Sequence, residues 1–112
     1  MTVIESNQGV ITQINVFDVD PDKVDLLVAT LQEAARTVTH VPGWMSANLH
    51  VSLDRTKVTN YAQCASKEAW DAVMEVVYAN GFIGKLTAIA RPNPCLYNVV
   101  WTLDHTQVTA GP

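Results

Sequence analysis

The stretch from Val58 to Trp70 constrains the fold most, because a strand pattern passes directly into a helix pattern within it. Alternate residues of its first half are expected to share one face of a strand: Val58, Asn60, Ala62 and Cys64. Ser66 then has the side chain of a helix N-cap, and the apolar residues from Trp70 onward follow a helical period. Because a buried amide needs a hydrogen-bonding partner, Asn60 on this otherwise apolar face marks a candidate functional position.

Elements on either side of this stretch complete the order β-α-β-β-α-β. Alternating apolar and polar residues predict strands over residues 10–19, 45–53, 56–65 and 95–103. Caps and apolar spacing predict helices over residues 20–40 and 66–80, with a short further helix over 82–90. This order is typical of a ferredoxin-like α+β fold, in which an antiparallel sheet carries its helices on one face.

The whole chain, residues 1–112, is expected to form one domain. Its core is predicted over about residues 10–103, with a mobile N-terminal arm over 1–8 and a polar tail over 104–112. The first and last predicted strands carry apolar residues on both sides, whereas helices would cover only one face of the sheet. A second copy of the chain is the natural cover for the other face, so we expect a homodimer, a dimeric α+β barrel.

Charge and cysteine content argue against several classes of partner. The formal charge is −4 and the basic residues are scattered, which argues against nucleic acid or an anionic membrane. Cys64 and Cys95 form no CxxC motif and have no histidines at metal-site spacing, so no metal is expected. No signal-peptide pattern and no stretch of roughly 20 apolar residues occurs, so we expect a reduced, cytoplasmic protein.

No familiar catalytic or phosphate-binding signature occurs in the chain. His40 and His105 are expected at the surface, and His50 lies inside a predicted strand, where a structural role is slightly favoured over a functional one. Asn15 and Asn60 form a sharper pair, because the first and third strands of this fold lie side by side at the centre of the sheet. The two amides either hold an oxygen of a ligand or bond to a loop backbone or to each other.

Aromatic residues are the other candidates for a binding site. Six of them could line a pocket for a flat aromatic molecule: Trp44, Tyr61, Trp70, Tyr78, Tyr97 and Trp101. Taken singly, each is more often a core or interface residue. Cys64 is most simply a small buried apolar residue, because a reactive thiolate would need a nearby cation and the sequence supplies none.

Two motifs carry a resemblance to a known family. They are Pro42-Gly43-Trp44-Met45-Ser46-Ala47 and Asn60-Tyr61-Ala62-Gln63, with His50 between them. On these motifs the chain resembles the antibiotic biosynthesis monooxygenase family from about Val10 to Trp101. The Pro-Gly turn indicates the fold, whereas Asn-Tyr-Ala-Gln is more specific. Within the family, the chain resembles the small quinone-forming monooxygenases of aromatic polyketide biosynthesis.

The resemblance implies a dimeric enzyme that oxidises a polycyclic phenol or anthrone to a quinone, with O₂ as co-substrate and no flavin, haem or metal. Asn15 and Asn60 match the family asparagines that would hold the substrate oxygen, and His50 matches a histidine that could move a proton. Further substrate contacts are expected at Tyr61, Cys64, Trp70, Tyr78 and Lys85.

Three positions depart from the family pattern. Cys64 stands where the family has tryptophan, Trp70 where a tyrosine is familiar, and Lys85 is a weak match to an expected arginine. Residues 66–90 contain no histidine for haem, so haem degradation is not expected. These departures keep open a non-oxidative pathway protein that binds or cyclises a polyketide or assists a larger enzyme. A general dimeric module for small reactive metabolites is a third hypothesis.

Overall fold

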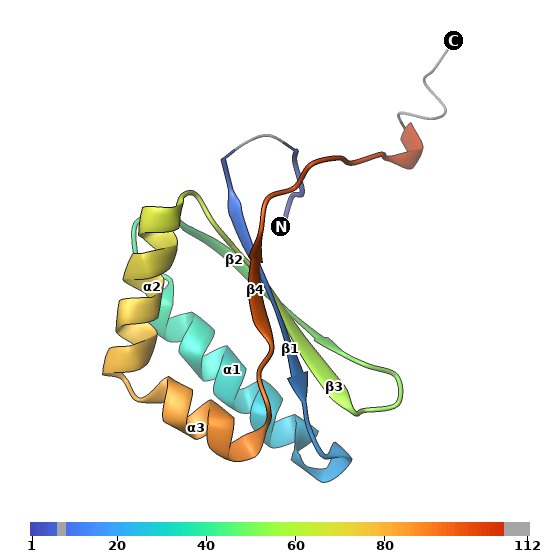
Figure 1. Cartoon of the computed structure of the whole chain (residues 1–112), viewed down its shortest axis with the longest axis vertical. Coiled ribbons are helices and arrows are strands. Elements are labelled where there is room, and N and C mark those ends of the chain that lie inside the picture. The colour runs from blue at the N-terminus through green and yellow to red at the C-terminus, as the bar shows by residue number, and fades with distance from the viewer. Residues whose placement is uncertain (7–8, 107–112) are drawn as a thin grey trace.

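A computed structural model gives the structure of the protein over residues 1–6 and 9–106. Within these residues, a four-stranded antiparallel sheet carries three α-helices on one face (Figure 1). The strands are β1 (Ile11–Asp18), β2 (Trp44–Val51), β3 (Lys57–Cys64) and β4 (Pro94–Tyr97). The helices are α1 (Val24–Val38), α2 (Lys67–Ala79) and α3 (Phe82–Ile89), with a short 3-10 turn η1 (Pro21–Lys23) before α1. Residues 7–8 of the predicted arm and 107–112 of the predicted tail lie outside the described residues.

The strands follow the order β2-β3-β1-β4 across the sheet, and each neighbouring pair is antiparallel. Together with the succession of elements along the chain, this order confirms the predicted ferredoxin-like α+β fold. The two central strands, β1 and β3, pair Asn15 with Asn60 and Phe17 with Val58. Because alternate residues of a strand point to opposite faces, these four side chains share the face that the helices cover.

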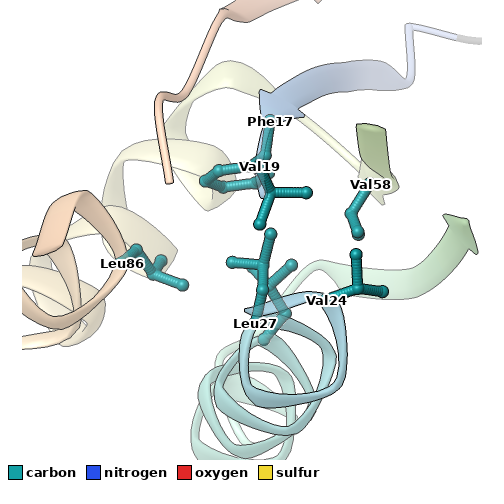
Figure 2. Packing of buried hydrophobic residues seen from close by; sticks show 7 residues of the cluster. Phe17, Val19, Val24, Leu27, Val58 and Leu86 are labelled. Carbon is teal, nitrogen blue, oxygen red and sulfur yellow. The ribbon is translucent and has the colours of Figure 1, made fainter. Parts of the chain in front are cut away.

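Two hydrophobic clusters join the helices to the sheet. One is formed by Phe17, Val19, Val24, Leu27, Leu31, Val58 and Leu86. Figure 2 shows Val24 and Leu27 of α1 pointing toward Val19, which directly follows β1, and toward Val58 of β3. The other is formed by Val38, Val41, Cys64, Ala69 and Val73. Full burial of a large aliphatic side chain stabilises the fold by about 1.5–3 kcal/mol, so these clusters hold the helix layer firmly on the sheet.

Two local contacts fix the connection from β3 into α2. Ser66 caps α2 as predicted, because its Oγ accepts a hydrogen bond from the backbone N–H of Ala69 at 3.1 Å. Gly43 has a φ of +87°, and a Cβ at that position would lie 2.6 Å from the Cβ of Ala69. Glycine alone meets both conditions, so the turn before β2 packs directly against the first turn of α2. This contact sets the position of Trp70, the next residue of the helix.

The last strand is shorter than the sequence predicts. A strand is expected over residues 95–103, but β4 pairs with β1 only over Pro94–Tyr97. Tyr97 lies opposite Thr12, and β1 begins one residue before Thr12, so the chain beyond Tyr97 has no strand to join. Figure 1 shows this segment running away from the sheet, and the side chains of Val100, Trp101 and Leu103 are exposed. The prediction is therefore wrong beyond Tyr97.

The face of the sheet opposite the helices, called here the open face, is partly covered by the N-terminal arm. Thr2 Oγ1 donates a hydrogen bond to Asn48 Oδ1, and Gln63 Nε2 donates one to the carbonyl oxygen of Val3, both at 2.8 Å. Two residues of the predicted mobile arm therefore contact the sheet. The cover is incomplete, since three large side chains of the open face remain partly exposed: Ile14, Val16 and Tyr61.

Candidate functional site

A cavity of about 100 Å³ lies between the sheet and the helices. Alternate residues of the two central strands form its floor: Gln13, Asn15 and Phe17 of β1, and Asn60, Ala62 and Cys64 of β3. The walls include Trp44 of β2, Leu31 of α1, Trp70 and Met74 of α2, and Ile83 of α3. The lining within the described residues is mostly apolar, and its amide groups are gathered on the floor. A cavity of this composition suits a flat apolar ligand that carries an oxygen.

A second depression of about 730 Å³ lies at the surface beyond the end of β1 and is a weaker candidate. Its lining includes Asp18, Lys57 and Arg91. Asp18 and Lys57 already form an ion pair, and the hydrogen bond from Lys57 holds the pKa of Asp18 below its usual value. Asp18 and Lys57 are thus engaged with each other at the surface, whereas the cavity contains a buried polar atom without a partner in the described part of the chain.

That atom is Asn60 Oδ1, which is buried and has no hydrogen-bond partner within residues 1–6 and 9–106. Asn15 lies directly opposite Asn60 in the β1–β3 ladder, so the predicted convergence of the two amides is confirmed. The hydrogen bonding of Asn15 is different, because its Oδ1 accepts a bond from the backbone N–H of Asn93 at 3.0 Å. The loop-backbone alternative thus applies to the oxygen of Asn15. Asn60 keeps an unused acceptor, and leaving a buried acceptor unpaired costs about 1–3 kcal/mol.

Cys64 lies at the end of the cavity floor and is only 1% exposed. Burial raises the pKa of its thiol, because the charged thiolate would lose its hydration there. The thiol is therefore neutral near pH 7 and is a poor nucleophile. It belongs to the hydrophobic cluster under α2 together with Val73 and Ala69. This environment agrees with the prediction of a small buried apolar residue.

The structure brings four of the predicted site residues to the cavity: Asn15, Asn60, Cys64 and Trp70. His50 and Tyr61 do not line it, because strand alternation turns both side chains to the open face. Tyr78 is 63% exposed on the outer side of α2. Lys85 is exposed on α3, where its Nζ lies 5.1 Å from the centre of the Phe82 ring.

Two residues near the site were not among the sequence candidates. Gln13 lies on the cavity floor two residues before Asn15, and the alternation of β1 was the signal that could have identified it. Asn93 fixes Asn15 and also donates from its Nδ2 to the carbonyl oxygen of Val16 at 2.8 Å. No local pattern identifies Asn93, because it contacts residues far away in the sequence.

Residues 1–6 and 9–106 contain no group of three or more His, Cys, Asp or Glu side chains arranged to hold a metal ion. No single helix in the same residues is long and apolar enough to cross a membrane. The pair α2 and α3 meets those criteria only when joined, and a bend of 77° separates the two helices.

The fold and the cavity define a class of protein: small ferredoxin-like domains with an apolar cavity between sheet and helices and amides on the cavity floor. The model of the family described as "Antibiotic biosynthesis monooxygenase" matches residues 10–75, which is more than half of the chain. The chain belongs to this family. The matched residues include both amide-bearing strands and most of α2, so they cover much of the cavity.

Individual relatives agree with this assignment. The tetracenomycin-F1 monooxygenase of Streptomyces glaucescens is 29% identical over 107 residues, which cover 95% of this chain and 96% of that protein. A mutant of SnoaB, a cofactor-independent oxygenase from Streptomyces nogalater, superposes with a TM-score of 0.76 at 17% identity, covering 85% of this chain and 97% of SnoaB. The ActVA-Orf6 monooxygenase of Streptomyces coelicolor, in complex with nanaomycin D, gives a TM-score of 0.73 at 23% identity, covering 86% and 92%. The two structures share the fold with this chain.

Proposed function

We propose that the protein is a cofactor-independent monooxygenase that oxidises a polycyclic phenol or anthrone-type polyketide intermediate to a quinone with O₂. The observation that carries this proposal is the unpartnered Asn60 Oδ1, buried beside Asn15 on the floor of an apolar cavity. The names of the similar proteins support the reaction class, since they include a tetracenomycin-F1 monooxygenase and a cofactor-independent oxygenase.

The proposed reaction balances with O₂ as the oxidant. The substrate loses a proton to become a phenolate, which passes one electron to O₂, and the resulting radical pair combines to a peroxide. Loss of water from this peroxide leaves a quinone, so one atom of O₂ enters the product and the other leaves as water. The protein therefore has to bind the anion, stabilise its charge and keep bulk water away.

Asn60 and Asn15 are suited to the charge on the substrate oxygen. An amide carries both an acceptor and donors, so Asn60 can accept a hydrogen bond from a phenol and donate one to the phenolate. The bond from Asn93 holds the Asn15 side chain in place and leaves its NH₂ group as the donor for a ligand. Fixed donors beside a developing negative charge are a major source of rate enhancement in enzymes.

Trp70 and Trp44 supply the apolar contact for the rings of the substrate. The cavity volume of about 100 Å³ is below the 300–1,000 Å³ typical of sites that bury a ligand of drug size. We therefore expect the walls to move apart when a polycycle binds, with the tryptophans displaced from the floor. Cys64 leaves space on the floor where the family has a larger side chain. His50, Tyr61, Tyr78 and Lys85 have no part in this proposal, because their side chains lie outside the cavity.

Oxygen uptake tests the proposed reaction. Anthrone is the probe, added to the purified full-length chain with and without a metal chelator. We expect one O₂ to be consumed per anthrone at the same rate under both conditions, with anthraquinone as the product. Uptake no faster than with heat-denatured protein would show that the protein is not an oxygenase for this class. Loss of uptake with chelator would contradict a cofactor-independent reaction.

A non-oxidative role is the second candidate, and Cys64 favours it. In the family pattern this floor position is a tryptophan, whereas here it is a buried neutral thiol. A protein that binds or cyclises a polyketide would bind the probe without consuming O₂. Quenching of tryptophan fluorescence by anthrone, without O₂ uptake, is the result that supports this alternative, since Trp44 and Trp70 line the cavity.

We further propose that two copies of the chain associate through the open face. The partly exposed Ile14, Val16 and Tyr61 lie on that face. The exposed Val100, Trp101 and Leu103 extend beyond β4 from the same sheet, where a second copy can cover them. An isologous contact of this kind buries apolar surface that a single chain leaves in water.

A further inference from the structure

Gln13 is a mostly buried residue whose amide has no hydrogen-bond partner in the described part of the chain. Its side chain lines the cavity from β1, and the residue is only 8% exposed. The side chain forms no hydrogen bond with any residue in the described ranges 1–6 and 9–106. Glutamine at the centre of a buried strand face is uncommon, because its amide loses water unless something replaces it. Neither amide atom of Gln13 is fully buried and unpartnered in the way that Asn60 Oδ1 is, so the amide stays accessible, and a ligand in the cavity that Gln13 lines can bind it.

The neighbours of Gln13 on the floor explain why the protein does not satisfy it. Directly across the ladder lies Ala62, whose side chain offers no hydrogen bond. Asn60 is the diagonal neighbour, at a separation that a side chain as long as glutamine can span. Even so, Asn60 Oδ1 remains unpartnered, so Gln13 does not turn toward it. Two amides within reach of each other thus both remain available to a third molecule.

We propose that Gln13 binds a second oxygen of the substrate, on a different ring from the oxygen that Asn15 and Asn60 bind. This inference rests on the proposed function and specifies its substrate class. Two residues along an antiparallel strand span about 6.8 Å between their Cα atoms, so the amide of Gln13 contacts a point of the ligand that is displaced along β1 from the oxygen at Asn15. The substrate is therefore a fused polycycle with oxygens on two rings of the same edge. Gln13 is a specificity-determining residue, because an amide left unpaired discriminates against a ligand that lacks the second oxygen.

A pair of probes isolates this contact. Anthrone has one oxygen, and 1,8-dihydroxyanthrone has further oxygens on the outer rings of the same edge. Gln13→Met keeps the length of the side chain and removes its hydrogen bonds. Gln32→Met is the matched control, because Gln32 is exposed on α1 and does not line the cavity. Both variants and the wild type are compared in kcat/KM for O₂ uptake and in affinity from tryptophan fluorescence.

We expect Gln13→Met to weaken binding of 1,8-dihydroxyanthrone about tenfold through KM, as for the loss of one hydrogen bond to a ligand. Binding of anthrone is expected to change less than twofold, and Gln32→Met to change neither. The different chemical reactivity of the two probes cancels, because each variant is compared with the wild type on the same probe. Thermal unfolding is expected to show that Gln13→Met is as stable as the wild type, since no internal hydrogen bond is lost.

The outcomes separate this inference from the proposed function. If the wild type consumes O₂ and Gln13→Met affects both probes equally, the role of Gln13 is wrong and the oxygenase proposal stands. If no O₂ is consumed but Gln13→Met selectively weakens binding of the dihydroxy probe, the role of Gln13 stands and the oxygenase proposal is wrong. If the wild type binds neither probe, both are wrong.

Discussion

Asn15 and Asn60 face each other directly across the β1–β3 ladder and line the same cavity, but they differ in hydrogen bonding. Asn15 Oδ1 accepts a bond from the backbone N–H of Asn93, whereas Asn60 Oδ1 has no partner within the described residues. The oxygen of one amide is therefore part of the framework of the fold, and the proposed function assigns the other amide to the ligand. This difference predicts opposite effects on stability when each residue is replaced.

Asn60→Leu should reduce activity without reducing stability. Leucine has the same number and branching of heavy side-chain atoms as asparagine and removes a buried acceptor that has no partner in the described residues, so the free energy of unfolding should stay constant or rise slightly. Oxygen uptake with anthrone should fall about 100-fold, the usual cost of removing one donor to a developing anion. Urea unfolding and an oxygen electrode measure the two quantities. A variant with full activity would remove Asn60 from the mechanism.

Asn15→Leu should reduce both activity and stability. The backbone N–H of Asn93 would lose its acceptor, at a cost of about 0.5–1.5 kcal/mol in the free energy of unfolding. Because Asn93 is exposed, water can replace part of that bond, and we expect the lower half of this range. Asn93→Ala is the control: it should lower stability through the lost bond to Val16 while retaining most activity. Equal stability of Asn15→Leu and Asn60→Leu would contradict the distinction.

Most of the fold follows from the sequence because two local signals agree with each other. The period of the apolar residues distinguishes strands from helices, and the cap at Ser66 marks the point where β3 gives way to α2. The pairing of Asn15 with Asn60 then follows from the topology, since β1 and β3 are central. The sequence does not predict where β4 ends, because the end of β4 depends on where β1 begins rather than on residues 98–103 themselves.

The candidate site is less completely predictable from the sequence. His50 and Tyr61 match family motifs, but strand alternation turns their side chains to the open face. Tyr78 and Lys85 lie on helices, where a difference of one residue moves a side chain from the cavity to solvent, as the positions of Val77 and Leu86 in the cavity lining illustrate. The role proposed for Gln13 depends on its burial and on its lack of a partner in the described residues, neither of which the sequence gives.

Gly43→Ala should destabilise the protein more than Gly81→Ala. Both glycines have positive φ, of +87° and +75°, so alanine at either position costs about 1 kcal/mol of backbone strain. At Gly43 the new Cβ would also lie 2.6 Å from the Cβ of Ala69, whereas at Gly81 nothing lies within 4 Å. The clash should add about 1–3 kcal/mol, measured as the difference in urea unfolding between the two variants. Equal losses of stability in the two variants would mean that the turn before β2 can shift to accommodate the new Cβ at little cost.

Cys64 should make stability fall with pH in the alkaline range. Burial raises the pKa of its thiol in the fold, while in the unfolded chain the thiol ionises near its ordinary pKa of 9.0. Above about pH 9 the unfolded chain therefore loses a proton that the folded chain keeps, which favours unfolding as the pH rises. Below that pH the thiol is protonated in both states and contributes no slope.

Urea unfolding near pH 7 and near pH 10 measures this effect as the free energy lost between the two conditions. The loss should be smaller for Cys64→Ala than for the wild type. Val73→Ala is the matched control, because Val73 packs in the same cluster and does not titrate. Val73→Ala should be less stable than the wild type at both pH values. Between the two pH values it should lose as much free energy of unfolding as the wild type does. If Cys64→Ala lost as much free energy of unfolding between the two pH values as the wild type, the thiol would ionise as freely in the fold as in the unfolded chain.

Ile14→Glu should prevent the proposed association of two chains. Ile14 lies on the open face beside Cys95 of β4 and Tyr61 of β3, near the centre of the surface that a second copy would cover. A carboxylate there would be buried without a partner, which costs several kcal/mol and should raise the dissociation constant at least about 100-fold. Leu26→Glu is the control, because Leu26 is exposed on α1, on the other side of the molecule. Light scattering should find dimers for the wild type and for Leu26→Glu, and monomers for Ile14→Glu. A monomeric wild type would contradict the proposed association, because the open face would then stay in contact with water.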